Sequence, residues 1–132
     1  MIFCDSTFWL AMRNVNDPYN EAAACILDGV EDRTIITTEL IRGDVATHLK
    51  RNVGSRPALA FIDALEVSPR VRVVPVPPAA QRDAMAWLRA HPAHPATFME
   101  AVNHAMMRRL CIVEILTFSR GYEGAGFEIL TA

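Results

Sequence analysis

Short apolar runs recur along the chain and are separated by longer segments with a different period. The main runs are "MIFC" at the N-terminus, "TIIT" at 34–37, "VRVVPV" at 71–76, which is rich in β-branched residues, and "IVEILTF" at 112–118, and "FEIL" at 127–130 is a shorter one. Such runs predict buried strands. Strands that alternate with helical segments predict an α/β fold, with a mostly parallel central sheet and helices on both faces.

The intervening segments carry helical spacing and capping residues. Asp5 or Ser6 can cap a helix that begins near Thr7, and Asp17, followed by Pro18, is predicted as the N-cap of a second helix. Prolines in "HPAHPA" at 91–96 predict a loop, because they push the preceding residues out of the α region. Further helices are predicted over 39–52, near 57–65, over 78–90 and over 97–110.

Composition is that of one ordinary globular domain over residues 1–132. Hydrophobic residues make up 52% and charged residues 21%, and the net charge of −2 provides no overall attraction to nucleic acid. The three cysteines, Cys4, Cys25 and Cys111, lack metal-ligand spacing and are predicted to be reduced core residues. The apolar runs are too short to span a bilayer and no signal-peptide pattern is present, which predicts a cytoplasmic protein with no membrane association.

Three acidic residues follow predicted strand ends or begin helices. Asp5 lies at the carboxyl end of the first strand, Asp44 one turn into the helix after the second strand, and Glu100 in the first turn of the helix from 97. Ligands of parallel sheets bind at the carboxyl ends of the strands. The three carboxylates can therefore converge, and they would repel one another unless a hard cation such as Mg²⁺ or Mn²⁺ joined them.

Each acid also has a purely structural interpretation. Asp5 can act only as a helix cap. Asp44 can pair with His48 four residues on. Thr97 and Glu100, in "TFME", have the spacing of a capping box.

Four segments of the chain resemble, in order and spacing, the signature segments of PIN domains. They are "MIFCDSTFWLAM", "TTELIRGDVATHL", "TFMEAVNHAMMRRL" and "ILTFSRGYEGAGFEIL", and the nearest likeness is to VapC-type toxins of bacterial toxin–antitoxin pairs. The resemblance implies a three-layer α/β/α sandwich with a divalent-metal ribonuclease site. It also implies a homodimer and a small antitoxin partner.

The resemblance assigns metal-site roles position by position. Asp5, Asp44 and Glu100 fall on the first three acidic positions of the family, and Ser119 falls on the fourth, which is usually aspartate. Three acids could hold one Mg²⁺ or Mn²⁺ ion, with Ser119 ordering a water ligand. Ser119 is the departure that weakens the expectation of catalysis most.

Substrate contacts are expected from hydroxyl and guanidinium groups near these acids. Ser6 and Thr7 adjoin the first acid, and Arg42 and Arg120 are candidates for binding RNA phosphates. Other chemistries match less well: a phospho-receiver would need a lysine on its last strand, but the only lysine, Lys50, lies mid-helix.

Two functions of different class follow from these residues. The first is a Mg²⁺-dependent endoribonuclease toxin that an antitoxin neutralises. The second is a PIN-fold module that binds RNA or protein, with weak or no catalysis because Ser119 replaces an acid.

Overall fold

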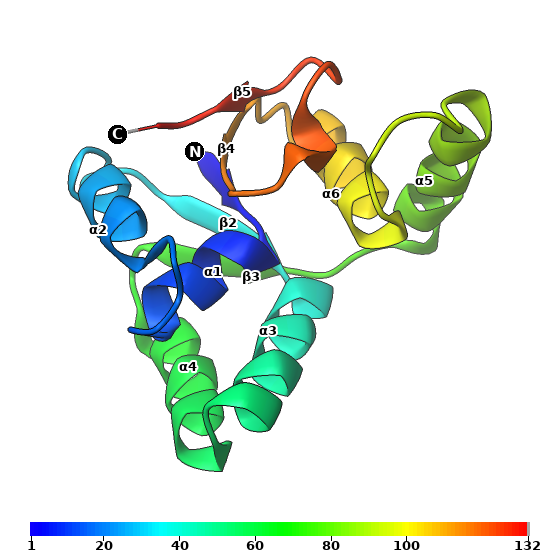
Figure 1. The fold of residues 1–132 in the computed structure, drawn as a ribbon. Helices are drawn as coiled ribbons and strands as arrows, with labels where there is room; N and C mark the ends of the chain where they lie inside the picture. The colour runs from blue at the N-terminus through cyan, green and yellow to red at the C-terminus, as the bar shows by residue number, and fades with distance from the viewer. Residues whose placement is uncertain (132) are drawn as a thin grey trace.

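Five parallel strands form the centre of the molecule. The computed structural model describes residues 1–131, and its strands lie in the order β3-β2-β1-β4-β5 (Figure 1). All four strand pairings are parallel. The strands are β1 (Ile2–Cys4), β2 (Ile35–Thr38), β3 (Val71–Val74), β4 (Glu114–Leu116) and β5 (Glu128–Ile129).

β1 lies in the middle of the sheet, which explains its unbroken apolar sequence. Phe3 lies opposite Ile36 of β2 and Ile115 of β4, and Cys4 lies opposite Leu116. Phe3 and Cys4 have no solvent exposure. A parallel strand with neighbours on both sides and helices on both faces has no polar side, so its side chains are apolar throughout.

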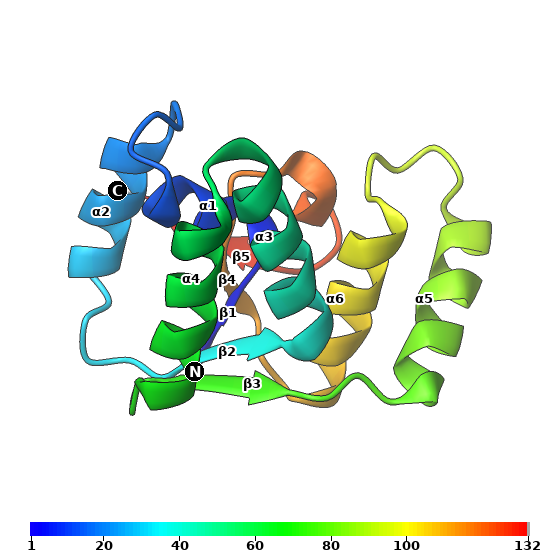
Figure 2. The ribbon, with the colours of Figure 1, turned by 90° about the horizontal axis from the view of Figure 1, so that it is seen from below.

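Helices cover both faces of this sheet, as the sequence predicts. α1 to α4 lie on one side, and α6 lies on the other, with α5 packed against the outside of α6 (Figures 1 and 2). Crossovers between parallel strands are right-handed, so connections that run in opposite directions along the sheet place their helices on opposite faces. The chain moves in one direction from β1 to β3 and in the other from β3 to β4. No helix within residues 1–131 is long and apolar enough to cross a membrane. The helices are α1 (Ser6–Arg13), α2 (Asn20–Asp28), α3 (Glu39–Asn52), α4 (Ser55–Val67), α5 (Pro78–Ala90), α6 (Phe98–Arg109) and the 3₁₀ helix η1 (Arg120–Tyr122).

The second helix begins later than predicted. The side chain of Asp17 accepts a hydrogen bond from the backbone N–H of Tyr19 at 2.8 Å, so it stabilises a turn before the helix rather than the helix itself. α2 starts at Asn20, and its N-cap residue Tyr19 makes no capping hydrogen bond through its side chain. The prediction that Asp17 is the N-cap was therefore wrong, because an aspartate before proline favours a turn of its own.

Two cysteines also differ from prediction. All three are free thiols, but only Cys4 is buried, whereas Cys25 and Cys111 are exposed. Cys111 follows the end of α6 with a φ of 56°. The N–H of Ile112 donates to the carbonyl of Met107 at 2.9 Å, and that of Cys111 to the carbonyl of Arg108 at 3.2 Å, which together close the helix in a Schellman motif.

Candidate active site

Asp5 is held by hydrogen bonds rather than by a cation. It follows β1, is only 2% exposed, and its Oδ1 accepts from the N–H of Phe8 at 3.1 Å as the N-cap of α1. The Thr7 hydroxyl donates to Oδ1 at 2.7 Å, and the Thr117 hydroxyl donates to Oδ2 at 2.6 Å. No Arg or Lys among the described residues forms an ion pair with this carboxylate. The capping role predicted for Asp5 is therefore confirmed, and both of its oxygens have partners.

The adjacent parallel strands bring Thr117 to Asp5. Cys4 and Leu116 are register partners, so Asp5 and Thr117 are the next residues on neighbouring strands. The N–H of Asp5 donates to the carbonyl of Leu116 at 3.2 Å. Sequence reasoning missed Thr117, although its position directly after a strand that pairs with β1 is a usable signal.

The environment of Asp5 disfavours its charge. The pKa of Asp5 is raised to about 6. Burial raises it most, hydrogen bonds from Thr117, Thr7 and the N–H of Phe8 oppose the rise, and the nearby negative charge of Glu100 adds a smaller increase. Burial, together with the charge of Asp5, also raises the pKa of Tyr122 well above its ordinary value, so this phenol stays neutral. A buried carboxylate with no cationic side chain beside it is a feature of sites that bind a cation.

Glu100 begins α6 as part of a capping box. Its N–H donates to the Thr97 hydroxyl at 3.2 Å, and its Oε1 accepts from the N–H of Thr97 at 2.9 Å, as the "TFME" spacing predicts. Its other oxygen, Oε2, accepts a hydrogen bond from the Ser119 hydroxyl. The structural interpretation of Glu100 is thus confirmed, and the same carboxylate also reaches the residue predicted as the fourth position.

η1 brings the backbone close to this carboxylate. Ser119 caps η1 by accepting from the N–H of Gly121 at 3.1 Å, and Nε2 of His104 lies 2.8 Å from the carbonyl of Gly121. A Cβ atom added to Gly121 would lie 2.4 Å from Cδ of Glu100. Only glycine at this position leaves the Glu100 carboxylate where it is. Burial lowers the pKa of His104 to about 4, so the ring is neutral and donates from Nε2.

Asp44 has a partner of its own. It is half-buried on α3, and its Oδ1 lies 3.3 Å from Nδ1 of His48. The same nitrogen lies 2.9 Å from the backbone carbonyl of Asp44. The predicted pairing of these two residues is therefore present.

The predicted acids nevertheless share one cavity. Its volume is about 380 Å³, and it lies at the carboxyl end of the sheet, as the positions of the acids predicted. Asn103 and Tyr122, which sequence reasoning missed, also line it. The complete lining is Asp5, Ser6, Thr7, Asp44, Pro95, Thr97, Met99, Glu100, Asn103, Ser119 and Tyr122.

The wall of this cavity contains oxygen atoms without partners. Nδ2 of Asn103 donates to the Tyr122 hydroxyl at 2.9 Å, which orients the amide, and its Oδ1 is buried with no hydrogen-bond partner among residues 1–131. The Ser6 hydroxyl is likewise buried and has no partner within the described part of the chain. Buried polar atoms are nearly always satisfied, so these two oxygens indicate a ligand or its water shell. Together with three carboxylates they form the all-oxygen donor set that Mg²⁺ and Mn²⁺ prefer.

The side chains are not gathered into a closed coordination sphere. Within residues 1–131, no group of three or more His, Cys, Asp or Glu side chains is placed to hold a metal ion. Glu100 is turned toward Thr97 and Ser119, and Asp44 toward His48. The donor chemistry of the three carboxylates fits a hard cation.

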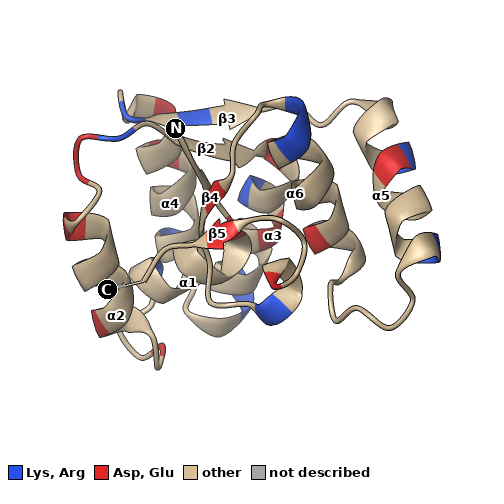
Figure 3. Ribbon diagram, turned by 90° about the horizontal axis from the view of Figure 1, so that it is seen from above, with Lys and Arg blue, Asp and Glu red and all other residues tan. Residues whose placement is uncertain are grey.

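Three of the residues predicted to contact substrate, Thr7, Arg42 and Arg120, lie in different environments. The Thr7 hydroxyl contacts Asp5, Thr117 and the N–H of Phe118, so its hydrogen bonds are used within the protein. Arg42 is half-buried on α3 and does not line the acidic cavity. Arg120 is exposed and pairs with Glu123 at 3.3 Å. Basic residues are dispersed over several elements rather than gathered on one face (Figure 3).

The chain is similar to characterised nucleases along its whole length. It is 32% identical over 127 residues to the 23S rRNA-specific endonuclease VapC20 of Mycobacterium tuberculosis, which covers 96% of this chain and 95% of that protein. The crystal structure of VapC20, described as a sarcin–ricin loop cleaving toxin, matches with a TM-score of 0.91 and 30% identity over all of both chains. No protein-family profile matches the chain.

Two more distant structures share the fold. FitAcB of Neisseria gonorrhoeae matches with a TM-score of 0.68 and 15% identity, over 99% of this chain and 97% of that one. VapBC2 of Rickettsia felis, bound to a DNA fragment from its promoter, matches with a TM-score of 0.68 and 8% identity, over 98% of this chain and 99% of that one. At these identities the likeness concerns the fold alone.

Proposed function

The chain belongs to the VapC family of PIN-domain toxins, and from this premise we propose that it is a Mg²⁺-dependent endoribonuclease that hydrolyses a phosphodiester bond of ribosomal RNA. The observation that carries the proposal is the cavity at the carboxyl end of the sheet, where Asp5, Asp44 and Glu100 arrive from three different elements. Carboxylates that converge without a cation of the protein's own suit the binding of a divalent ion.

The residues of the site have distinct roles in this proposal. Asp5, Asp44 and Glu100 would hold Mg²⁺ or Mn²⁺, and a bound ion supplies a more acidic water and offsets charge on phosphate oxygens. Thr7 and Thr117 fix the orientation of Asp5 through their hydroxyl groups. Ser119 fixes Glu100 in the same way and takes the fourth position as a neutral oxygen.

The relatives suggest the class of substrate. VapC20 is named a 23S rRNA-specific endonuclease and a sarcin–ricin loop cleaving toxin, and we propose the same class of RNA for this chain. A loop presents a phosphodiester that can enter a recessed cavity, whereas a base-paired helix keeps its backbone outside. Ser6, with its unpartnered hydroxyl, and the exposed Arg120 are the proposed phosphate contacts.

Family membership also supports two partners. We propose a homodimer and a cognate antitoxin that silences the cavity, both acting in the cytoplasm where ribosomes are found. If an antitoxin placed Arg side chains against the three acids, their guanidinium groups would neutralise the same carboxylate charge that a bound metal ion neutralises.

Ser119 supports a second candidate function. With only three acids, two of which are turned toward other partners, the chain could bind RNA or protein through the PIN fold with weak or no catalysis. The two candidates differ in metal-dependent turnover.

Cleavage of 23S rRNA by the purified chain tests the proposal. We expect a discrete cut in Mg²⁺ or Mn²⁺, none in chelator, and none with Asp5→Asn. Asp63→Asn is the matched control, because this acid is exposed on α4 and does not line the cavity. A cut that survives chelator or Asp5→Asn would refute the metal role, and RNA binding without any cut would favour the module.

A further inference from the structure

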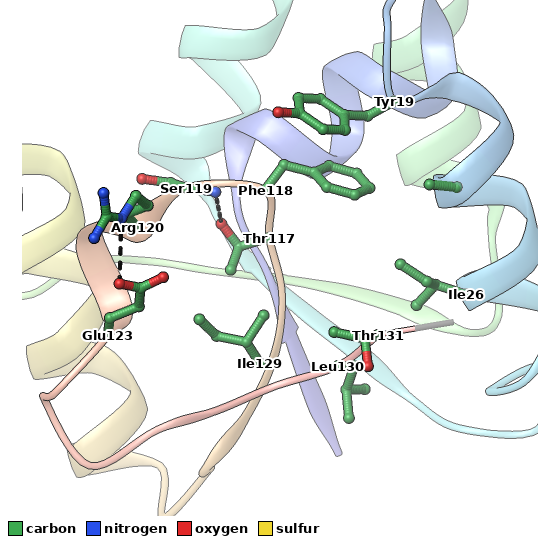
Figure 4. Close-up of a pocket in the computed structure, with 11 residues that line it drawn as sticks. Tyr19, Ile26, Thr117, Phe118, Ser119, Arg120, Glu123, Ile129, Leu130 and Thr131 are labelled. Carbon is green, nitrogen blue, oxygen red and sulfur yellow. Dashed lines mark hydrogen bonds and ion pairs between the residues drawn. The ribbon is translucent and has the colours of Figure 1, made fainter.

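A second cavity opens beside the acidic one. It is an apolar groove of about 380 Å³ between α2 and β5, over the carboxyl end of β4 (Figure 4). Its walls are formed mainly by apolar side chains, and Ser119, Arg120 and Glu123 lie together at one end (Figure 4). The lining residues that matter below are Tyr19, Ala22, Thr117, Phe118, Ser119 and Arg120.

The two cavities meet at the end of β4. Ser119 lines both of them, and Thr117, which lines the groove, donates a hydrogen bond to Asp5. Figure 4 shows the Ser119 hydroxyl pointing away from the apolar side chains of the groove. A ligand group in the groove and a phosphate in the acidic cavity would therefore be separated by a single residue of the protein, Ser119.

The groove carries stacked aromatic rings at its border. The Phe118 ring lies parallel to that of Tyr19, with centroids 4.5 Å apart, and parallel to that of Phe8 at 5.4 Å. Tyr19 is 51% exposed, so part of this ring is free. At the polar end, the Arg120 side chain is 83% exposed and pairs with Glu123, which lines the same end, at 3.3 Å. An exposed aromatic ring is a common platform for single-stranded bases.

We propose that this groove binds a nucleobase of the RNA next to the phosphodiester that is cut, a proposal that rests on the proposed ribonuclease function. A base has flat apolar faces and polar edges, which matches apolar walls with the ion pair of Arg120 and Glu123 at one end. The volume lies within the range of small-ligand pockets. Continuity with the acidic cavity favours the substrate over a peptide, because one nucleotide can occupy both.

RNA stem-loops with a single missing base test this subsite. The dissociation constant is measured in the Asp5→Asn background, for a stem-loop with the sarcin–ricin sequence and for versions that are abasic at each nucleotide flanking the cut. Tyr19→Ala should weaken binding of the intact RNA about 5- to 100-fold, the effect of losing one base–aromatic contact. One of the abasic RNAs should bind the protein that retains Tyr19 as weakly as the intact RNA binds the Tyr19→Ala variant. Its binding should not weaken further when Tyr19→Ala is introduced.

Controls separate this proposal from its alternatives. Tyr19→Phe keeps the ring and should bind normally, Leu59→Ala removes an exposed apolar side chain from α4 and should have no effect, and Ala22→Phe, which fills the groove, should act like Tyr19→Ala. If Tyr19→Ala weakened the binding of every RNA by the same factor, or weakened none of them, the proposed subsite would be wrong. If Ala22→Phe instead weakened only antitoxin binding, the groove would belong to the antitoxin. Retained Mg²⁺-dependent cleavage in either case would leave the ribonuclease function standing.

Discussion

Asp5 is a buried negative charge that destabilises the metal-free fold above its own pKa. Its pKa rises on folding from 3.8 to about 6, so the folded protein holds this proton more tightly than the unfolded chain. The stability that the proton provides is fully present below about pH 4 and is lost as the pH rises through 6. A shift of this size corresponds to about 3 kcal/mol.

This linkage gives a prediction for Asp5→Asn. The variant has no charge to bury, so its free energy of unfolding should exceed that of the parent by an amount that grows between pH 4 and 7 in chelator. Urea unfolding at each pH measures the difference, and Mg²⁺ at pH 7 should stabilise only the parent. A difference that stayed constant with pH would contradict the buried charge.

Ser119 allows the fourth position to be tested by charge alone. Asp and Asn at 119 can both accept the hydrogen bond from Gly121 as an N-cap, but only Asp adds a charge near Glu100. Ser119→Asp should therefore bind Mg²⁺ at least tenfold more tightly than Ser119→Asn, about 1.4 kcal/mol. It should also be the less stable of the two without metal. Calorimetric titration measures the affinities, and equal values would mean that position 119 does not face the ion.

Some site residues could be predicted from sequence and others could not. Asp5, Asp44 and Glu100 follow strand ends or begin helices, so their arrival at one cavity follows from the parallel sheet. Asn103 and Tyr122 carry no such signal, because a polar residue in a helix and an aromatic residue in a Gly-rich stretch are ordinary. Their roles depend on a side-chain contact between segments that are distant in sequence.

At the scale of elements, α6 begins with a residue that is both a cap and a candidate ligand. Gln can replace Glu at the third helical position of a capping box, so Glu100→Gln should leave the unfolding free energy nearly unchanged while it abolishes metal-dependent cleavage. Thr97→Ala should do the reverse, and lower stability by about 1 kcal/mol with cleavage largely retained. Chemical unfolding and RNA cleavage on both variants check this. Glu100→Gln with full activity would mean that Glu100 serves the helix alone.

The other end of α6 gives a stability prediction. Cys111 adopts a left-handed backbone with a φ of 56°, which is unfavourable for any residue with a Cβ. Cys111→Gly should raise the free energy of unfolding by up to about 1 kcal/mol, whereas Cys25→Gly, within α2, should lower it by a similar amount. Thermal unfolding under reducing conditions compares the two. Destabilisation by Cys111→Gly would show that the thiol contributes contacts.

Two helices, α3 over Glu39–Asn52 and α5 over Pro78–Ala90, have the bounds that the sequence predicted. α3 begins where the Thr38 hydroxyl accepts from the N–H of Ile41, and α5 begins with a proline in its first turn. β4 is shorter than its apolar run, since Ile112 and Val113 complete the turn out of α6 and only Glu114–Leu116 pair. An apolar run marks burial, but pairing depends on neighbouring strands that the run does not contain.

The whole molecule exposes several large apolar side chains on its helices. Leu59 and Val67 on α4 are 60% and 80% exposed, and Phe98 at the start of α6 is 48% exposed. Together with family membership, this supports the prediction of a homodimer. Light scattering at micromolar concentration should give twice the mass of the 14.7 kDa chain. A monomer across that range would contradict the prediction.

Gly121 makes the nuclease site dependent on the absence of one methyl group. Its backbone lies outside the left-handed region, so alanine would be tolerated there except for its contact with the Glu100 carboxyl group. Gly121→Ala would turn that carboxylate aside while every charge in the chain is retained. Such a protein should fold, fail to cut RNA and still capture antitoxin, so in a cell that carries the parent pair it would act as a decoy that frees the active toxin.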